Sequence, residues 1–462
     1  MNLISLKDNT LNQEFSVGKP FDSVRKALDS VAGKNLKSLA DKDFKFIIYP
    51  PFSKELDVKC NDVIFNVDYS DISKPKITTG NIMGFLCLND DVRVKIISRF
   101  DSDNKNYFLH YMLQKICNVV YTPRTDAGED SFYDFLYYLF PNFLNEALKQ
   151  GVFRAYVNRE YNDANVRGPI DISRHIRYNI PFNGKIAYHT REYTTDNYVT
   201  QLVRHTIEYI RLLSCGKSVL DGDVSSKTSD NIKAIEFATP TYNRKDRQHV
   251  ISQNLRPITH PYYTAYESLR KICLAILMNK KLSYGENSTS QINGILFDGA
   301  CLWEEYLNTV LVKKFKDSLI HPNNRTGFGV QYLFKDGGCQ KIRRIYPDFL
   351  IDGNVKEGMI DSAIAIIDAK YKRLDERIDR DDVFQILAYL FRFKSKQGFL
   401  VHPVEYCKVC EPRNLTLYND DSVKLTIVPF VVPKTTGSFE EFCAAMKDAE
   451  EKMKSYLSIE NE

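Results

Sequence analysis

The stretch RRIYPDFLIDGNVKEGMIDSAIAIIDAKYKR, residues Arg343–Arg373, decides the fold of the C-terminal part of the chain. It contains a Pro-Asp pair, ending in Asp348, inside one apolar run. A second apolar run, Ile364–Ile367, ends in Asp368-Ala-Lys370. Such a continuous apolar run is typical of a strand that is buried on both faces. Because side chains alternate along a strand, we expect Asp368 and Lys370 to point to the same side.

These charged side chains predict a metal site. Asp348, on the neighbouring strand, is expected to bring its carboxylate close to that of Asp368. Two carboxylates in apolar surroundings repel each other unless a cation lies between them. Oxygen ligands favour a hard ion, Mg²⁺ or Mn²⁺, over zinc. Lys370 would add a positive charge that orients a metal-bound water and offsets charge developing on a phosphate. The pattern therefore indicates hydrolysis of a phosphodiester.

Two flanking helices supply further candidates. Glu304, within LWEEYL on the preceding helix, is a third carboxylate that could reach the same metal. Gln385 and Tyr389, on the following helix, are one turn apart and share a face. Each feature also has an ordinary interpretation: Asp-x-Lys as a surface salt bridge, Gln385 as a solvated position and Tyr389 as a core aromatic residue. The combination, more than any single residue, favours a catalytic site.

At 462 residues the chain is too long for one compact core, and three domains are expected. Residues 1–122 are predicted to form a β-rich N-terminal domain, with a hairpin that turns at Asn89–Asp91. Residues 123–290 are predicted to be a mixed helical and strand region, with helices at 130–151, 196–216 and 262–282 and strands around a turn at 152–179. Residues 291–462 follow an α/β pattern. We expect this last domain to fold without the first, because its predicted elements all lie after Gln291.

The bulk composition limits the function. A net charge of +4 permits a nucleic-acid partner without requiring one. No apolar run approaches the roughly 20 residues that span a bilayer, so no membrane association is expected. The scattered cysteines are typical of a reduced, cytoplasmic protein. Cys407 and Cys410 form a lone C-x-x-C, which we interpret as structural because zinc and iron–sulfur sites need four ligands at recognisable spacing.

One segment imitates a nucleotide-binding motif. SCGKS, Ser214–Ser218, ends like a phosphate-binding loop. The motif requires a glycine where this chain has Arg211, and it requires a preceding strand, whereas this segment ends a predicted helix. The sequence therefore shows no NTPase motif of its own.

In their order, these elements resemble the PD-(D/E)XK nuclease superfamily in its version with a trailing Gln-x-x-x-Tyr. The chain is most similar to the McrC family, the nuclease subunits of McrBC restriction systems. LWEEYL, YPDFLI, IIDAKYKR and FQILAY look like the nuclease motifs of that family. Upstream, GFLCLNDDVRVKI and RGPIDISRHIRYN look like its N-terminal segments. The resemblance covers residues 82–433.

The resemblance implies an α/β fold with a C-terminal PD-(D/E)XK core, a mixed sheet flanked by helices. Residue by residue, Glu304, Asp348 and Asp368 would hold Mg²⁺ or Mn²⁺, Lys370 would serve the attacking water, and Gln385 would position water or backbone. The resemblance also implies a DNA endonuclease of a modification-dependent restriction system. Its substrate would be methylated double-stranded DNA. Its partner would be a separate McrB-like AAA+ GTPase, for which residues 1–122 are the candidate docking domain.

Two other functions are compatible with the sequence. A stand-alone RecB-like DNA nuclease would share Gln-x-x-x-Tyr, and its iron–sulfur versions need four cysteines that frame the core. A catalytically inactive module could instead bridge a motor to DNA. The intact set of Asp348, Asp368 and Lys370 argues against an inactive module.

Overall fold

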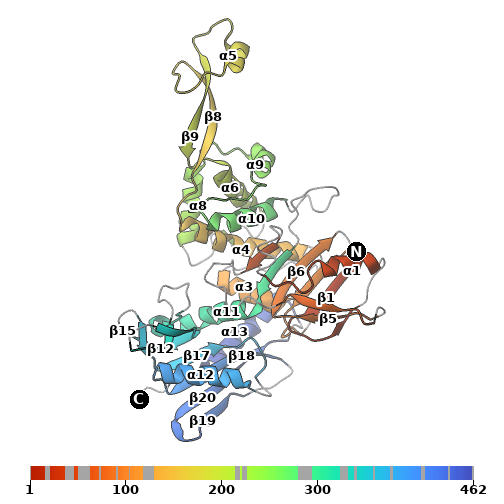
Figure 1. Ribbon diagram of the computed structural model, residues 1–462, viewed down its shortest axis with the longest axis vertical. Helices are drawn as coiled ribbons and strands as arrows, with labels where there is room; N and C mark the ends of the chain where they lie inside the picture. Colours follow the sequence, from red (N-terminus) through yellow and green to blue (C-terminus); the bar gives the residue numbers. More distant parts are fainter. Residues whose placement is uncertain are drawn as a thin grey trace. The chain divides into compact units, whose positions relative to one another are not determined.

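The computed structural model shows a mixed α/β protein with several sheets (Figure 1). It describes residues 2–15, 21–36, 46–49, 63–71, 74–89, 92–102, 105–117, 130–213, 219–220, 226–278, 294–322, 331–337, 341–356, 359–374, 378–406, 411–434 and 437–459. The chain forms two compact units. Unit 1 comprises residues 1–116, 122–128 and 292–462, and unit 2 comprises residues 117–121 and 129–291.

The N-terminal part of unit 1 contains a five-stranded sheet of order β1-β7-β6-β10-β3. Its strands are β1 (Asn2–Lys7), β7 (Val92–Ile97), β6 (Ile82–Asn89), β10 (Gly294–Asp298) and β3 (Phe46–Tyr49). The predicted hairpin is confirmed, because β6 and β7 pair antiparallel; two of its expected turn residues, 90 and 91, lie outside the described residues. A core of apolar side chains joins the sheet to α1 (Phe21–Asp29) and to a small sheet of β2 (Gln13–Glu14), β5 (Lys76–Thr79) and β4 (Phe65–Asp68).

Strand β10 ties this sheet to the C-terminal part of the chain. Its five residues are all buried, and it pairs antiparallel with β6 and parallel with β3. It leads directly into helix α11 (Gly299–Phe315), where the side chain of Asp298 caps the helix by accepting a hydrogen bond from the Cys301 backbone N at 3.0 Å. The structure thus groups the expected first and third domains in one unit. Without residues 1–122, β10 would lose both of its neighbouring strands. The expectation that residues 291–462 fold alone stays a prediction.

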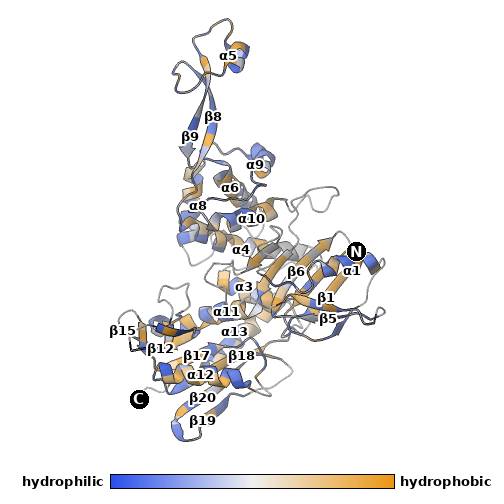
Figure 2. Ribbon diagram, in the orientation of Figure 1, coloured by the Kyte–Doolittle hydropathy of each residue, from blue (hydrophilic) through white to orange (hydrophobic). Residues whose placement is uncertain are grey.

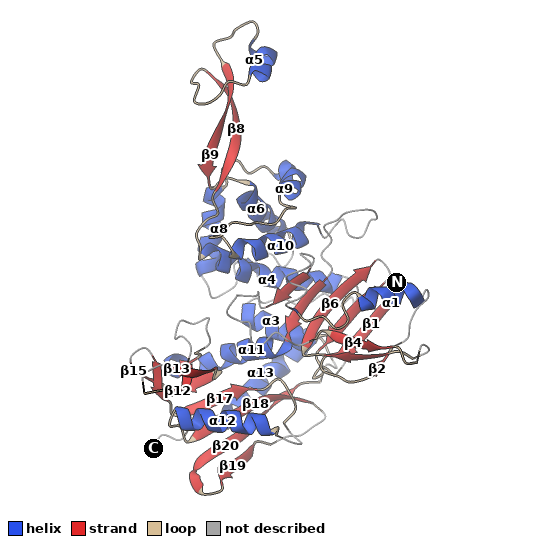
Figure 3. Ribbon diagram, in the orientation of Figure 1, coloured by secondary structure: helices blue, strands red, loops and turns tan. Residues whose placement is uncertain are grey.

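The C-terminal part of unit 1 is built on a six-stranded sheet of order β11-β14-β17-β18-β20-β19. These strands are β11 (Leu319–Ile320), β14 (Phe349–Ile351), β17 (Ala365–Ala369), β18 (Gln397–Glu405), β20 (Asp420–Val432) and β19 (Arg413–Leu417). Strands β17, β18 and β20 run parallel. Helix α12 (Arg380–Arg392) connects β17 to β18 and packs on both (Figure 3). Two two-stranded sheets lie nearby in sequence: β12 (Gln331–Lys335) with β13 (Lys341–Ile345), and β15 (Asn354–Lys356) with β16 (Met359–Ser362).

Helices cover both faces of the six-stranded sheet. Leu425 and Ile427 of β20 belong to the same apolar cluster as residues of α12. Phe430 has the opposite parity along the strand and packs against Trp303 and Tyr306 of α11, with ring centroids 5.4 and 5.9 Å away. Helix α13 (Phe439–Tyr456) also packs on β20. Helix α3 (Tyr107–Cys117) joins this side, because Tyr111 donates a hydrogen bond to Glu450 of α13 at 2.7 Å.

Unit 2 consists of helices and one long hairpin. The helices are α4 (Asp130–Leu148), α6 (Tyr198–Arg211), α8 (Ser226–Ala238), α9 (Arg247–Gln253) and α10 (Ala265–Met278). The predicted helices at 130–151, 196–216 and 262–282 are confirmed as α4, α6 and α10, and the expected ends at 214–216 and 279–282 lie outside the described residues. Strands β8 (Ala155–Asp163) and β9 (Ile186–Thr194) pair antiparallel and extend away from these helices, with α5 (Ile172–Asn179) at the far end (Figure 1). Among the helices in the described part of the chain, none is long and apolar enough to cross a membrane.

The expectation of strands throughout residues 152–179 was half wrong. Strand β8 is present, but its partner is β9, and residues Ile172–Asn179 form helix α5. Asp171 begins this helix by accepting a hydrogen bond from the Arg174 backbone N at 3.0 Å. Gly168 permits the close approach that precedes it, since a Cβ there would lie 2.1 Å from the carbonyl oxygen of His189. The motif RGPID therefore lies after the end of β8 and starts helix α5.

We predict that Gly84→Ala destabilises unit 1 strongly. Gly84 has φ +140°, and a Cβ there would lie 2.1 Å from the carbonyl oxygen of Ile295 in β10. The loss should be about 3 kcal/mol or more, because strained backbone and overpacking each cost on the order of 1–3 kcal/mol. Thermal unfolding of the full chain measures it.

Gly33→Ala is the matched control for this substitution. Gly33 also has a positive φ, +73°, but the nearest atom to an added Cβ is the Asn66 side-chain oxygen at 3.8 Å. At Gly33 the substitution should add only backbone strain, which lowers the free energy of unfolding by about 1 kcal/mol. Equal stability of the two variants would contradict a tight β6–β10 contact.

Candidate active site

Two buried carboxylates lie opposite each other in the six-stranded sheet. Phe349 of β14 pairs with Ile367 of β17, so Asp348, just before β14, lies across from Asp368. These aspartates are only 6% and 2% exposed. The Asp348 Oδ2 atom accepts a hydrogen bond from the Ala369 backbone N at 2.8 Å, which holds its carboxylate at the end of β17. The structure therefore brings the two predicted aspartates together.

Lys370 supplies a positive charge at this pair. Its Nζ atom lies 2.5 Å from Asp368 Oδ2, and its backbone N still bonds to Val401 O at 2.9 Å, in continuation of the sheet. Burial lowers the pKa of Lys370, but Asp368, Asp348 and Asp382 outweigh burial, and the net pKa is raised above the ordinary value of 10.5. The side chain is therefore an ammonium at neutral pH, able to donate hydrogen bonds to an anion.

Helix α12 contacts the side chain of Lys370. Gln385 accepts a hydrogen bond from Lys370 Nζ at 2.7 Å and donates one to the Tyr389 hydroxyl at 2.9 Å. Tyr389 is also a core residue, 4% exposed and part of the apolar cluster under α12. Tyr389 is therefore both a core aromatic residue and part of the site, because its ring packs in the core and its hydroxyl accepts a hydrogen bond from the amide of Gln385. This chain of hydrogen bonds orients Lys370.

Asp382 belongs to the same group, although the sequence did not single it out. It is 6% exposed, and its carboxylate lies 3.7 Å from Lys370 Nζ and 2.7 Å from Lys372 Nζ. Its position in the first turn of α12 explains why it was missed, since acidic residues at helix starts usually serve the helix dipole. A signal was present, however, because Asp382, Gln385 and Tyr389 share one face of the helix.

Glu304 lies on α11, the helix that packs on the other face of the sheet. It is 7% exposed on α11, and its Oε1 atom lies 3.8 Å from the Nε2 atom of His321. The Nδ1 atom of His321 donates to the carbonyl oxygen of Asp348 at 2.6 Å, and its ring stacks on Phe349. Glu304 is thus linked to Asp348 through His321. No pattern in the sequence marks this histidine, because it follows a two-residue strand at the sheet edge.

The donor chemistry of Asp348 and Asp368 fits a hard divalent cation. Both groups are buried carboxylates on facing strands, and oxygen donors of this kind are the ligands that Mg²⁺ and Mn²⁺ prefer. In the arrangement that the structure describes, the positive charge at Asp368 is the ammonium of Lys370. Within the described residues, no three Asp, Glu, His or Cys side chains are gathered closely enough to hold a metal as they stand.

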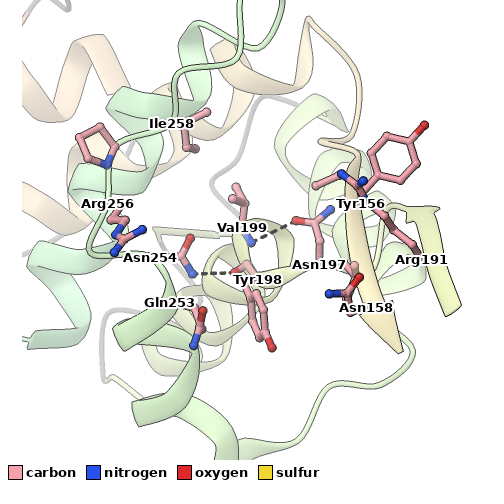
Figure 4. A pocket seen from close by; sticks show the side chains of 13 residues that line it. Tyr156, Asn158, Arg191, Asn197, Tyr198, Val199, Gln253, Asn254, Arg256 and Ile258 are labelled. Atoms are coloured by element: carbon pink, nitrogen blue, oxygen red, sulfur yellow. Dashed lines mark hydrogen bonds between the residues drawn. The ribbon is translucent and has the colours of Figure 1, made fainter. Parts of the chain in front are cut away.

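A separate pocket lies in unit 2, where β8 meets α6. It has a volume of about 650 Å³, and its lining includes Tyr156, Arg191, Tyr198, Asn254 and Arg256 (Figure 4). Asn254 donates a hydrogen bond to the Tyr198 carbonyl oxygen at 2.8 Å. The described residues that line it include no carboxylate. The pocket therefore lacks the acidic ligands of the aspartate–lysine site.

Two segments noted in the sequence lie outside the described residues. These are Cys407 and Cys410, and the SCGKS segment at residues 214–218. The interpretation of the two cysteines as structural stays a prediction.

The fold and the site together define a mixed α/β protein with a buried aspartate–lysine centre. A model of the family described as "McrBC 5-methylcytosine restriction system component" matches residues 77–403, more than half of the 462 residues. The chain therefore belongs to this family, and the resemblance predicted from the motifs is confirmed.

Solved structures from Thermococcus gammatolerans are similar to the chain at 15% identity. One chain is from a "refined half-complex from tetradecameric assembly" of McrB AAA+ hexamers with bound McrC, with TM-score 0.48, covering 97% of this chain and 100% of that chain. Another is from a cryo-EM structure of the McrBC complex, with TM-score 0.32, covering 68% of this chain and 88% of that chain. No curated protein matches the sequence.

We predict that Lys370→Met destabilises the protein when divalent cations are removed. The change leaves Asp348 and Asp368 facing each other without the ammonium, and breaking a buried ion pair in this way costs on the order of 3 kcal/mol. Adding Mg²⁺ or Ca²⁺ should raise the melting temperature of the variant more than that of the unaltered protein. Thermal unfolding with and without a chelator measures both effects.

Lys394→Met is the control, because its ammonium pairs with Asp361 at the surface, 66% exposed. It should change the melting temperature little, with or without cations. If Lys370→Met were as stable as this control in chelator, the ion pair would not offset the repulsion of the aspartates.

Proposed function

We propose that this chain is the metal-dependent DNA endonuclease subunit of a McrBC-type, modification-dependent restriction system, with a PD-(D/E)XK catalytic core. One observation carries the proposal: the facing pair Asp348 and Asp368 lies at the end of a buried strand with Lys370, which is oriented by Gln385. The family of the chain supports the restriction role. The substrate is proposed to be methylated double-stranded DNA.

The side chains of the site suit hydrolysis of a phosphodiester, in which water adds to phosphorus and one ester bond breaks. Lys370 can donate hydrogen bonds to the attacking water or to the phosphoryl oxygens, where negative charge develops. Gln385 holds the ammonium in place and can accept or donate a further hydrogen bond. Asp368, Asp348 and Asp382 together outweigh the effect of burial and keep the lysine charged.

Asp348 and Asp368 would hold Mg²⁺ or Mn²⁺, with Glu304 as a third ligand. The cation would supply a Lewis acid that lowers the pKa of a bound water and offsets charge on the phosphate. Because Lys370 now pairs with Asp368, binding of the cation would compete with this ion pair. The competition would free the ammonium for the substrate.

We further propose that a separate McrB-like AAA+ GTPase activates the chain. The hairpin β8–β9 is a better docking candidate than residues 1–122. Within the described part of residues 1–122, the exposed large apolar side chains are Leu3 and Leu11. The hairpin and its tip expose many more, and Figure 2 shows hydrophobic and hydrophilic residues side by side at α5. They are Tyr156, Val166, Ile170, Ile172, Ile176, Tyr178, Ile180, Phe182 and Tyr193.

Such a run of exposed apolar side chains suits a protein surface. The hairpin also carries arginines that lie over its aromatic rings, such as Arg191 over Tyr156 at 4.7 Å and Arg177 over Tyr178 at 5.4 Å. Arginine and tyrosine are enriched at protein interfaces. The composition of the hairpin therefore fits a partner surface better than it fits a solvent-exposed connection.

The alternative enzyme is a stand-alone RecB-like nuclease. Its iron–sulfur versions need four cysteines that frame the core, and a purified protein without iron would count against them. The alternative without catalysis is a bridging module. The ion pair and hydrogen bonds of Lys370 favour catalysis, because an inactive module would not need a buried ammonium among three aspartates.

We predict that Asp368→Asn and Lys370→Ala each lower DNA cleavage at least about a hundredfold, because each removes a group that acts on the charge of the transition state. Cleavage should require Mg²⁺ or Mn²⁺, whereas Ca²⁺ should support DNA binding without turnover. The assay uses methylated DNA, the AAA+ partner and GTP. Lys394→Ala should cleave normally. Full activity of Lys370→Ala, or of the protein after exhaustive chelation, would refute the proposed site.

We predict that replacing Ile172, Ile176 and Phe182 together by serine abolishes association with the AAA+ partner and the rise in GTP hydrolysis. The three side chains are 69%, 55% and 68% exposed, so the hairpin should stay folded. A pull-down and a GTPase assay measure the effect.

Phe237→Ser is the matched control for the hairpin variant. Phe237 is an aromatic residue of the same unit, 92% exposed on α8, and it is not part of the hairpin or its tip. The Phe237→Ser variant should bind the AAA+ partner and raise its GTP hydrolysis as the unaltered protein does. If the hairpin variant still bound the partner, the docking surface would lie elsewhere, with residues 1–122 the next candidate.

A further inference from the structure

Tyr371, the residue after Lys370, is anchored in the N-terminal sheet of unit 1. Its side chain is 5% exposed, and its hydroxyl lies 2.8 Å from the hydroxyl of Ser98, which follows β7. Phe100 packs edge-on against its ring at 5.3 Å. The chain of the active site thus passes directly from the catalytic lysine into contact with a different sheet.

Arg99 makes the closest contacts to this residue. Its guanidinium donates a hydrogen bond to the carbonyl oxygen of Tyr371 and lies 4.8 Å from the centre of the tyrosine ring. Another of its nitrogens donates to the Asn81 side chain at 3.0 Å. Arg99 is only 7% exposed, so its charge is removed from water. A planar guanidinium can hold these several partners in fixed directions, which an ammonium cannot do.

Asp8 fixes Arg99 in turn. The carboxylate is fully buried, with Oδ1 accepting from the Arg99 backbone N at 2.6 Å and Oδ2 lying 3.6 Å from the guanidinium. Burial raises the pKa of Asp8 to about 6, although Arg99 acts in the opposite direction. A buried ion pair is poor evidence for stability, because apolar residues of similar volume often do as well. The contribution of the Asp8–Arg99 pair is that it fixes the direction of the Arg99 guanidinium.

The ring of Tyr371 also sets the start of α11. A Cβ on Gly299 would lie 2.7 Å from the Tyr371 Cε1 atom and 3.1 Å from the Asn81 carbonyl oxygen. The Gly299 backbone N donates to that same carbonyl at 2.9 Å. Only glycine allows the ring to rest on the helix start at this distance. The helix that begins here carries Glu304.

We propose that Arg99, with Asp8 and Tyr371, is a positioning residue of the active site. It fixes the backbone that directly follows Lys370 and, through the tyrosine ring, the start of the helix that carries Glu304. The N-terminal sheet is then part of the catalytic framework, in addition to any role in docking. This inference rests on the nuclease function proposed above.

The deciding variant is Arg99→Lys, examined in the full chain. It keeps a positive charge beside Asp8, whereas Arg99→Ala would leave that buried carboxylate without a partner and endanger the fold. We expect kcat for cleavage of methylated DNA with the partner to fall about tenfold or more, with KM changed less than about twofold, because small displacements of a catalytic group are costly. Hydrogen exchange of the backbone at residues 365–374 should become faster. Tyr371→Phe, which removes only the hydroxyl, should show the same changes to a smaller extent.

Tyr111→Phe is the matched control. It also removes one buried hydroxyl in unit 1, which donates to Glu450 at 2.7 Å. It should lower the melting temperature but leave kcat and the exchange at residues 365–374 unchanged. Equal losses of kcat in Tyr111→Phe and Arg99→Lys at equal melting temperatures would overturn the proposal, as would normal kcat and exchange in Arg99→Lys. If the unaltered protein failed to cleave DNA, the nuclease proposal would fall, and the exchange measurement alone would decide whether Arg99 holds this backbone.

Discussion

The repulsion between two carboxylates governs the C-terminal part of this protein. Asp348 and Asp368 lie opposite each other on paired strands, shielded from water, so a positive charge must stay beside them. Lys370 meets this need because it follows Asp368 by two residues and so points to the same side of the strand. The face that carries the three charges is the one that α12 covers, which is why Gln385 and Asp382 can reach the lysine.

A second constraint comes from the strand before α11. Because β10 lies between β6 and β3, the helix that carries Glu304 starts directly after an interior strand of the N-terminal sheet. Arg99 and Tyr371 make a further connection between that sheet and the end of β17. Helix α11, which carries Glu304, and the end of β17, which precedes Lys370, are therefore both held by the same sheet. A change in that sheet would therefore displace the site through two buried connections, β10 to α11 and Arg99 to Tyr371.

In unit 2, the β8–β9 hairpin and the contacts that order its tip are the main feature. The helices of this unit bury their own core, whereas the β8–β9 hairpin and its tip expose apolar side chains. A two-stranded hairpin buries little surface, so interactions at its tip matter for its order. Asp171 caps α5, and Asn179 is fully buried and donates a hydrogen bond to Asn162 at 2.8 Å. These contacts shape the tip, and its apolar side chains remain exposed.

The sequence by itself determined the local chemistry. The apolar run before Asp368, the alternation that aligns Lys370 and the turn spacing of Gln385 and Tyr389 are properties of neighbours along the chain, and the family followed from the same motifs. Tertiary structure alone decided the rest. Nothing local marks β10 as a strand between β6 and β3, or joins His321 to Glu304 and Arg99 to Tyr371. These contacts link residues far apart in sequence, and they form because buried charges and unpaired strand edges must find partners wherever the fold provides them.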